Sequence, residues 1–220
     1  MSIAENLQNL KKELPGHVTL VAVSKTKPVS ELMEAYEAGQ RIFGENKIQE
    51  MTDKREQMPG DIEWHMIGHV QRNKVKYMAE YVSLIHGVDS LKLLKEIDKQ
   101  AAKHQRVISC LLQVHIAEED TKFGMSEEEA IALVGSRELE ALEHVKVVGF
   151  MGMATFTEDE AQVKKEFQTL RALFDKVSRE HPEIRILSMG MSGDYTTAIA
   201  CGSTMVRIGS SIFGARNYHG

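Results

Sequence analysis

The sequence contains few of the residues that mark special classes of protein. It has only 2 cysteines and 4 prolines, and no apolar stretch approaches the roughly 18 residues that a membrane-spanning helix needs. Two cysteines cannot build a disulfide framework, so Cys110 and Cys201 are expected to be buried free thiols in a reducing compartment. The N-terminus carries Glu5 and has no long apolar run of the kind found in a signal peptide. Together these absences predict a cytoplasmic protein without a membrane partner.

The chain also lacks a surplus of basic residues. It has 27 Lys and Arg against 32 Asp and Glu, which gives a net charge of −5. Proteins that bind duplex nucleic acid usually present a basic surface, so no nucleic-acid partner is expected. A length of 220 residues with 42% hydrophobic residues is enough for one globular domain with a sizeable core. We therefore expect residues 1–220 to form a single domain.

Short apolar or β-branched runs alternate with longer helical patterns along the chain. The predicted strands cover residues 18–24, 41–43, 62–67, 81–86, 106–116, 145–150, 184–187 and 205–208. An extra helix over about residues 3–14 precedes the first strand, and another helix is expected over residues 70–80. This alternation predicts a parallel sheet with helices outside it, and eight such units favour a closed (β/α)8 TIM barrel. An open doubly wound sheet is the alternative.

Signals for the ends of helices support this interpretation. Gly39 suits the left-handed residue that often ends a helix. Ser126 with Glu129, and Thr157 with Glu160, have the spacing of capping boxes at the starts of two further helices. The helices of the predicted barrel are therefore bounded in the sequence itself.

Lys25 is the most distinctive single residue, because it follows a strand predicted to be buried on both faces. In an α/β barrel the functional residues gather at the carboxyl ends of the strands. A lysine that loses part of its solvation there has a lowered pKa, and its free amine can form a Schiff base. The alternative is a strand-end lysine that reaches solvent or pairs with an acid such as Glu45.

Glycines and serines follow the seventh and eighth predicted strands. The backbone amides of Gly193 and Gly209, with the hydroxyls of Ser192 and Ser210, can surround a phosphate. The short helix expected after Gly193 would direct its positive end at the same anion. A phosphate site between the last two strands is a recurrent feature of this barrel. The alternative is that these residues only make turns.

A phosphate site opposite a strand-end lysine is the arrangement that pyridoxal 5′-phosphate (PLP) needs. The lysine would take the aldehyde and the amides would take the phosphate. Arg207 lies on the last predicted strand, where alternation can point it inward at the ring nitrogen of PLP. A guanidinium has only donors and stays charged, so it would keep that nitrogen unprotonated and weaken the cofactor as an electron sink. The alternative for Arg207 is a surface ion pair.

Two histidines near the third predicted strand raise the question of a metal site. His65 and His69 are four residues apart, but Gly68 intervenes and the segment reads as strand into loop. The helical geometry that places two histidines on one zinc ion is therefore not expected. We predict polar residues near a site and no metal ligands.

Several motifs resemble those of the pyridoxal phosphate homeostasis proteins. They occur in order between about Val18 and Arg216, without large gaps. The motifs are Ala22-Val-Ser-Lys-Thr-Lys-Pro28, Phe43-Gly-Glu-Asn46 with Gln49-Glu50, Trp64-His-Met-Ile-Gly68, Lys122-Phe-Gly124, Leu187-Ser-Met-Gly-Met-Ser192, Gly202-Ser-Thr-Met-Val-Arg-Ile-Gly209 and Ile212-Phe-Gly-Ala-Arg216.

This resemblance implies a barrel like the N-terminal domain of alanine racemase, with PLP bound to Lys25. The other cofactor-binding residues that it implies are Asn46, Met191, Ser192, Gly193, Arg207, Gly209 and Ser210. The implied role is PLP binding in intracellular PLP homeostasis, without efficient catalytic turnover and with no catalytic residue. Storage of PLP, sensing of PLP and delivery to PLP-dependent apoenzymes all stay open as roles.

The main alternative is a PLP-dependent amino-acid racemase. Racemisation needs a proton donor and a proton acceptor on opposite faces of the substrate. Related racemases place the second group, a tyrosine, on a partner subunit that a C-terminal β-domain positions, whereas this chain ends at Gly220 soon after the eighth predicted strand. A Schiff-base aldolase would carry its lysine on the sixth strand, where only Lys146 occurs, at the start. We therefore expect a cofactor-binding protein, and a monomer.

Overall fold

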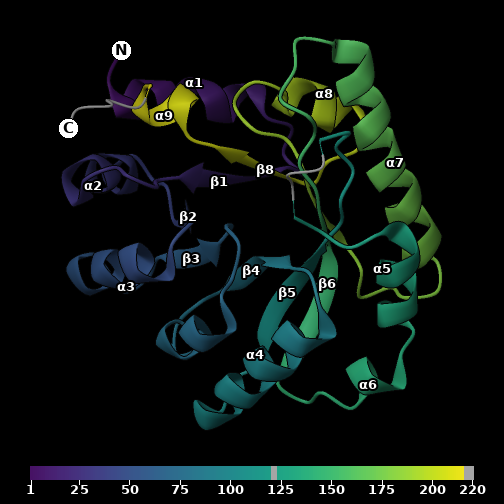
Figure 1. Cartoon of the computed structure of the whole chain (residues 1–220). Helices are drawn as coiled ribbons and strands as arrows, with labels where there is room; N and C mark the ends of the chain where they lie inside the picture. Colours follow the sequence, from purple (N-terminus) through teal and green to yellow (C-terminus); the bar gives the residue numbers. More distant parts are fainter. Residues whose placement is uncertain (120–122, 216–220) are drawn as a thin grey trace.

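The computed structural model describes residues 1–119 and 123–215, and its strands form a closed barrel (Figure 1). The strands are β1 (Thr19–Val23), β2 (Ile42–Glu45), β3 (Glu63–Met66), β4 (Leu84–Val88), β5 (Ile108–Gln113), β6 (Val145–Met151), β7 (Ile186–Ser188) and β8 (Met205–Ile208). They pair in chain order, and β8 closes the ring by pairing in parallel with β1. The predicted eight-stranded barrel is confirmed, and the open sheet is excluded.

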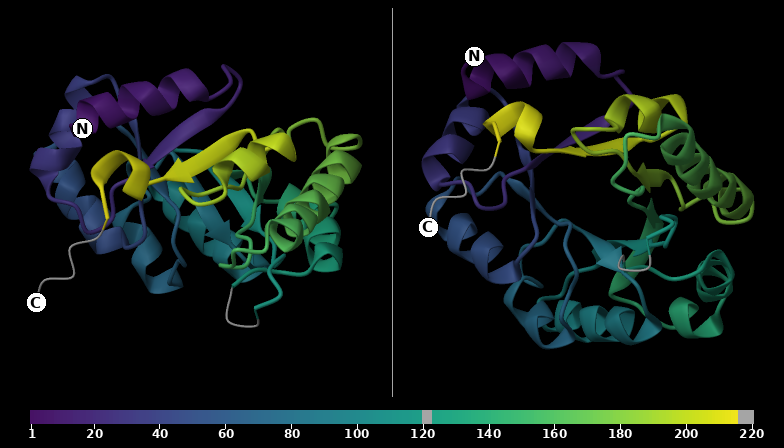
Figure 2. Two further views of the ribbon diagram at one scale, coloured as in Figure 1. Left: turned by 90° about the horizontal axis from the view of Figure 1, so that it is seen from above. Right: turned by 45° about the horizontal axis from the view of Figure 1, so that its top comes forward.

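Helices surround this ring of strands, as the right-hand view of Figure 2 shows. They are α1 (Ile3–Glu13), α2 (Val29–Glu37), α3 (Ile48–Gln57), the 3₁₀ helix η1 (Arg72–Tyr77), α4 (Leu91–Lys103), α5 (Glu127–Val134), α6 (Arg137–Glu140), α7 (Glu160–Ser178), α8 (Tyr195–Ala200) and α9 (Ser210–Phe213). The expected extra helix is α1, which packs against α2 and α9 near the two ends of the described chain (Figure 1).

The segment between β3 and β4 differs from its prediction. A helix over residues 70–80 was expected, but the segment forms the 3₁₀ helix η1 followed by turns. The amide of Met78 donates to the carbonyl of Val75, and the amide of Tyr81 donates to the carbonyl of Met78. Both bonds span three residues, and Val75 and Met78 are fully buried. Apolar residues three apart lie on one face of a 3₁₀ helix, and this explains the tighter winding.

The predicted helix caps are confirmed at two of three positions. Gly39 has φ +97°, in the left-handed region. Ser126 and Glu129 form a capping box at α5, in which each side chain accepts from the other residue's amide. The capping box predicted at Thr157 is wrong, because Asp159 caps α7 and its carboxylate accepts from two first-turn amides. The Thr157 hydroxyl instead accepts from the amide of Asp159.

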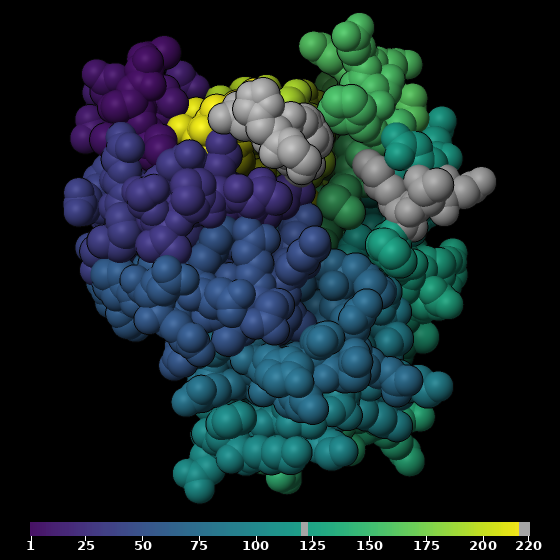
Figure 3. All heavy atoms as spheres, turned by 60° about the vertical axis from the view of Figure 1, so that its left-hand side comes forward, coloured from purple at the N-terminus to yellow at the C-terminus, as the bar shows by residue number. Residues whose placement is uncertain are grey.

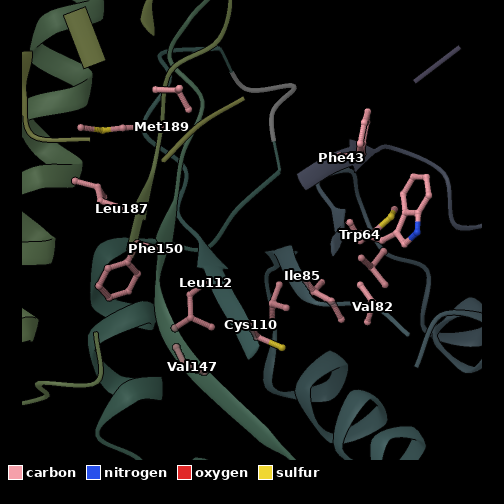
Figure 4. Close-up of a cluster of buried hydrophobic side chains, with 14 of the residues drawn as sticks. Phe43, Trp64, Val82, Ile85, Cys110, Leu112, Val147, Phe150, Leu187 and Met189 are labelled. Atoms are coloured by element: carbon pink, nitrogen blue, oxygen red, sulfur yellow. The ribbon is translucent and has the colours of Figure 1, made fainter. Parts of the chain in front are cut away.

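Hydrophobic side chains form one layer inside the barrel and another between the strands and helices. The inner layer contains Val21, Leu84, Leu111, Val148, Met151 and Met205. The outer layer is larger, and Figure 4 shows part of it, with Phe43 and Trp64 on one side and Phe150 and Leu187 on the other. Side chains alternate between the layers along most of the strands, so the parity of a residue indicates whether it faces the barrel interior. Shifts in the strand register interrupt this alternation at β4 and β6, and Val148 and Met151 of β6 both lie in the inner layer.

Consecutive units of the chain are neighbours in space. On the face shown in Figure 3, the colours run in sequence order from the purple N-terminal segment at the top to teal at the bottom. Cys110 and Cys201 are buried free thiols, as predicted. In residues 1–119 and 123–215, no helix is both long enough and apolar enough to cross a bilayer.

Candidate functional site

The carboxyl ends of the strands surround a cavity of about 810 Å³. This volume lies in the range of small-molecule and cofactor sites. The cavity is lined by all the residues expected to bind a cofactor, namely Lys25, Asn46, Met191, Ser192, Gly193, Arg207, Gly209 and Ser210. Residues from both ends of the chain are thereby brought together. Lys122 and Arg216, which belong to the motifs quoted above, lie outside the described residues.

Lys25 reaches the cavity because every second side chain of β1 points into the barrel, and Lys25 continues this alternation beyond the end of the strand. Val21 belongs to the inner hydrophobic layer, and Val23 and Lys25 both line the cavity. Glu45, the acid considered as an alternative partner for Lys25, accepts hydrogen bonds from the Lys54 amine at 2.7 Å and from the Ser24 hydroxyl at 2.6 Å. The carboxylate of Glu45 is thus engaged by α3 outside the barrel.

Lys27 also lines the cavity, but its amine is directed elsewhere. Its Nζ atom donates to the carbonyl oxygen of Phe213 at 2.9 Å, and it lies 3.6 Å from the carboxylate of Glu31. These two contacts hold the Lys27 amine against the end of α9 and the first turn of α2. Of the two lysines, Lys25 is therefore the one suited to meet a ligand in the cavity.

The loops after β7 and β8 meet at Ser192 and Gly209. The amide of Gly209 donates to the Ser192 hydroxyl at 3.3 Å, and a Cβ atom on Gly209 would lie 3.0 Å from the carbonyl oxygen of Val23. Within the part of the chain that the structure describes, the amides of Ser192 and Gly193 donate to no protein acceptor. Ser210 begins α9, where the first amides have no acceptor within the helix. This set of amides and hydroxyls fits a phosphate.

The short helix α8 has an acidic residue at its start, beside the cavity. Asp194 precedes its first turn, and the Asp194 carboxylate accepts from the amide of Met191 at 2.6 Å. An acidic side chain at this position offsets part of the positive charge at the end of the helix. An anion held by the start of α8 stays a prediction, and the amides of Ser192 and Gly193 are further donors on the same loop.

Arg207 is buried inside the barrel, so the alternative of a surface ion pair is wrong. Arg207 is only 3% exposed. It lies two residues after Met205 on β8, so both side chains point into the barrel. The guanidinium donates to the Ser188 hydroxyl and, at 3.2 Å, to the carbonyl oxygen of Gly152. Burial lowers the pKa of Arg207 to about 10, against the opposing charge of Asp194. The guanidinium thus remains charged at neutral pH.

A chain of buried polar side chains continues from Arg207, and the sequence interpretation missed it. The Ser188 hydroxyl lies 2.9 Å from Nδ1 of His86, whose Nε2 lies 3.0 Å from Nδ1 of His65. Burial lowers the pKa of His65 to about 3. Burial, with the repulsion that a second protonated imidazole and the charged Arg207 would exert, holds the pKa of His86 well below its usual value. Both rings are therefore neutral. Because the guanidinium can only donate, the Ser188 hydroxyl accepts from Arg207, whereas the donor and the acceptor in the two contacts of His86 depend on the tautomers of the rings.

The alternation of inward and outward side chains along the strands is the sequence signal that could have predicted this series of polar residues. His65, His86 and Ser188 are polar residues in otherwise apolar strands, and each occupies an inward position. Polar groups inside a closed barrel need partners, since an unpaired buried polar group is costly. Three inward polar residues on β3, β4 and β7 therefore predict a hydrogen-bonded connection to Arg207, once the barrel is known to be closed.

Asn46 is brought to the cavity by the close approach of the loops after β2 and β3. A Cβ atom on Gly68 would lie 2.3 Å from the carbonyl oxygen of Asn46, so only glycine permits this approach. His69 lies at the rim, stacked on the ring of Phe123, whereas His65 is buried in the chain behind Arg207. Among the described residues, no three His, Cys, Asp or Glu side chains are placed to hold one metal ion.

Residues 1–217 match the family model of the alanine racemase N-terminal domain. The pyridoxal phosphate homeostasis protein of Vibrio alginolyticus is 39% identical over 232 residues and 99% of each chain. That of Escherichia coli strain K12 is 36% identical, over 98% of this chain and 97% of its own.

The comparison with solved structures points to the same family as the comparison of sequences. PipY of Synechococcus elongatus PCC7942, solved without PLP, has a TM-score of 0.91 at 35% identity, over 97% of this chain and 100% of PipY. The same protein with PLP bound has a TM-score of 0.88. Alanine racemase of Clostridium difficile 630, at 17% identity and a TM-score of 0.80, shares the fold over 56% of its length. The chain belongs to the family of the pyridoxal phosphate homeostasis proteins, built on the barrel of the alanine racemase N-terminal domain.

Proposed function

We propose that this protein binds PLP in intracellular PLP homeostasis and holds it as a Schiff base on Lys25. The observation that carries the proposal is the meeting of a lysine, a set of amide and hydroxyl donors, and a buried charged arginine around one cavity. The names of the relatives and the PLP-bound structure of PipY support the same ligand.

Each part of PLP has a matching group in this cavity. Lys25 would hold the aldehyde carbon of PLP as a Schiff base, a C=N bond whose formation releases one water molecule. The amides of Ser192, Gly193 and Ser210, with the two serine hydroxyls, would donate to the phosphate. Arg207 would donate to the pyridine nitrogen, and Asn46, Met191 and Gly209 would complete the walls. The aldehyde, the phosphate and the ring nitrogen of the ligand would thereby each have a partner.

We propose that the protein holds PLP without efficient turnover. A charged arginine at the ring nitrogen disfavours protonation there, and this weakens PLP as an acceptor of carbanion electrons. Among the described residues that line the cavity there is no tyrosine to act as the second acid–base group of a racemase. Racemisation of an amino acid by the purified protein at roughly 1–1000 turnovers per second would contradict this proposal.

The domain organisation, the cellular location, the oligomeric state and the partners of the protein belong to the same proposal. We infer a single PLP-binding domain over residues 1–220 that acts as a cytoplasmic monomer, and delivery to PLP-dependent apoenzymes is one of the three roles that stay open to it, beside storage and sensing of PLP. Buried reduced thiols at Cys110 and Cys201 support a reducing compartment. The cavity opens at one end of the barrel, and this supports exchange of the ligand with a recipient.

A comparison of two lysine variants tests whether PLP forms its Schiff base with Lys25. PLP is added to the wild type, to Lys25→Ala and to Lys27→Ala, excess ligand is removed by gel filtration, and the visible absorbance of the Schiff base is recorded. Wild type and Lys27→Ala are expected to retain the band, and Lys25→Ala is expected to lose it. A full band in Lys25→Ala would overturn the proposal, because no other lysine of the cavity is suited to the bond.

A further inference from the structure

The backbone on both sides of Lys25 is held by α3. The carbonyl oxygen of Ser24, in the peptide group before Lys25, accepts from the Lys54 amine at 2.7 Å. The amide of Thr26, in the peptide group after Lys25, donates to the Glu50 carboxylate at 2.6 Å. These two peptide groups determine the direction of the Cα–Cβ bond of Lys25. Side chains on a neighbouring helix therefore control where the Lys25 side chain points.

Lys54, Glu45 and Glu50 form one cluster behind Lys25. The Lys54 amine also donates to Glu45 and to Glu50, at 2.7 Å in each case. An ammonium has three donors, and the Ser24 carbonyl and the two carboxylates use all of them. Glu45 and Lys54 are buried, whereas the Glu50 side chain is 25% exposed. A buried ion pair contributes little net stability compared with apolar packing, so the geometry that it imposes explains its presence better than stability does.

Thr26 indicates a functional constraint at the same place. Its φ is +63°, in the left-handed region that a β-branched residue rarely adopts. Such conformations persist only where the surroundings enforce them, and they gather at functional sites. The Lys27 amide donates to the Ser24 carbonyl at 3.1 Å and closes a turn around Thr26, and the bond from the Thr26 amide to Glu50 ties this turn to α3, immediately after the lysine of the cavity.

We propose that Glu50 and Lys54 are positioning residues that direct the Lys25 amine at the aldehyde of bound PLP. This inference rests on the proposed function. The phosphate donors lie on the loops after β7 and β8, whereas the cluster acts on the loop after β1. The cluster should therefore affect formation of the C=N bond and leave the recognition of the phosphate unchanged.

The test compares two ligands that differ only at the reacting carbon. PLP carries an aldehyde, and pyridoxine 5′-phosphate carries an alcohol that cannot form the bond. Glu50→Ala is the main variant, because it frees the Thr26 amide and leaves Lys54 paired with the buried Glu45. Glu50→Gln is the conservative variant, since its amide oxygen can still accept from Thr26. Asp98→Ala is the matched control, because Asp98 accepts from the amide of His144 at 2.7 Å, just before β6 and away from the cavity.

Glu50→Ala is expected to weaken PLP binding by at least about tenfold, the loss that follows from one charge-assisted hydrogen bond. The Kd for pyridoxine 5′-phosphate should stay within about twofold of wild type. Glu50→Gln should recover most of the PLP affinity, and Asp98→Ala should change neither Kd.

Three outcomes would overturn the inference. If Glu50→Ala weakens both ligands equally, Glu50 has a merely structural role. If Glu50→Ala leaves PLP binding unchanged, the contact with Thr26 does not position Lys25. If wild type binds the two ligands equally and shows no Schiff-base absorbance, the proposed function fails and this inference fails with it. The last outcome is recognised in wild type alone, so the two failures are distinguishable.

Discussion

Ser192 and Ser210 lie on the two loops that carry the proposed phosphate donors. The Ser192 hydroxyl accepts from the amide of Gly209, so its own proton is available to a further acceptor. Ser210 is exposed at the start of α9 and lines the cavity. Neither side chain is buried in the hydrophobic layers, so removing their hydroxyls should affect ligand binding more than folding.

The double variant Ser192→Ala with Ser210→Ala is therefore expected to weaken PLP binding by about 1–3 kcal/mol for each hydrogen bond lost to the phosphate. Equilibrium dialysis with PLP measures this loss. Pyridoxal, which lacks the phosphate, should bind the variant and the wild type alike. Ser211→Ala is the control, because Ser211 is exposed and does not line the cavity. Unchanged PLP binding by the double variant would remove the phosphate-site argument.

Among the helices, α7 holds two loops of the cavity wall in place. The buried carboxylate of Glu166 accepts from the amide of Glu118, from the amide and hydroxyl of Thr155, and from the side chain of Gln162. Glu118 lies on the loop after β5 and Thr155 on the loop after β6. One carboxylate thus joins both loops to α7. Burial alone would raise the pKa of Glu166, but these hydrogen bonds together lower it.

Glu166→Gln is expected to lower the free energy of unfolding by about 1–3 kcal/mol at pH 7, because hydrogen bonds to a charged acceptor are lost. The lowered pKa means that this contribution is present above the unfolded pKa of about 4.3 and is lost as pH falls through the folded value. Urea unfolding at pH 7 and in acid should therefore show a variant effect that shrinks in acid. An equal effect at both pH values would contradict this assignment.

Asp175→Asn provides the control for this measurement. Asp175 lies on the same helix and pairs with Arg171 at 2.8 Å, but both side chains are well exposed. Exposed ion pairs contribute little, so the control should stay within about 0.5 kcal/mol of wild type.

The elements could be predicted closely from the sequence, whereas their polar contacts could not. Strands such as β8 were predicted at their observed limits, because buried parallel strands are short apolar runs bounded by glycine or polar residues. Lys25, Ser192 and Gly209 were expected at the site from their place after a strand, whereas Asn46 and Met191 were implied by the family resemblance alone. The contact between His86 and Ser188 joins strands far apart in the chain, and no local pattern specifies such a pair. For α7, the sequence predicted a cap at Thr157, whereas the cap is Asp159, two residues later.

At the scale of the whole molecule, closure of the barrel creates the polar interior. The pairing of β1 with β8 places Val21 beside Arg207, residues from opposite ends of the chain. The side-chain amide of Asn6 on α1 donates to the carbonyl of Ile212 on α9 at 3.0 Å, and this contact also joins the two ends of the chain. The neutral histidines and the charged arginine thus depend on one closed fold, and the pH dependence of stability should report on them.

Buried neutral histidines should make the fold sensitive to mild acid. The pKa of His65 is lowered to about 3, so below the unfolded value of about 6.5 only the unfolded chain takes up this proton. Stability should fall as pH decreases from about 6.5, by up to ~1.4 kcal/mol per pH unit for this residue. His65→Asn should reduce the slope of unfolding free energy against pH between pH 6.5 and 5. An unchanged slope would mean that His65 is solvated or charged in the folded protein.

Covalent trapping tests the central claim most directly. The protein is loaded with PLP and reduced with borohydride, which turns the C=N bond into a stable amine, and its peptides are analysed by mass spectrometry. The account predicts one modified peptide, with the phosphopyridoxyl group on Lys25. Modification of Lys27 or of another lysine, or no modification at all, would contradict it.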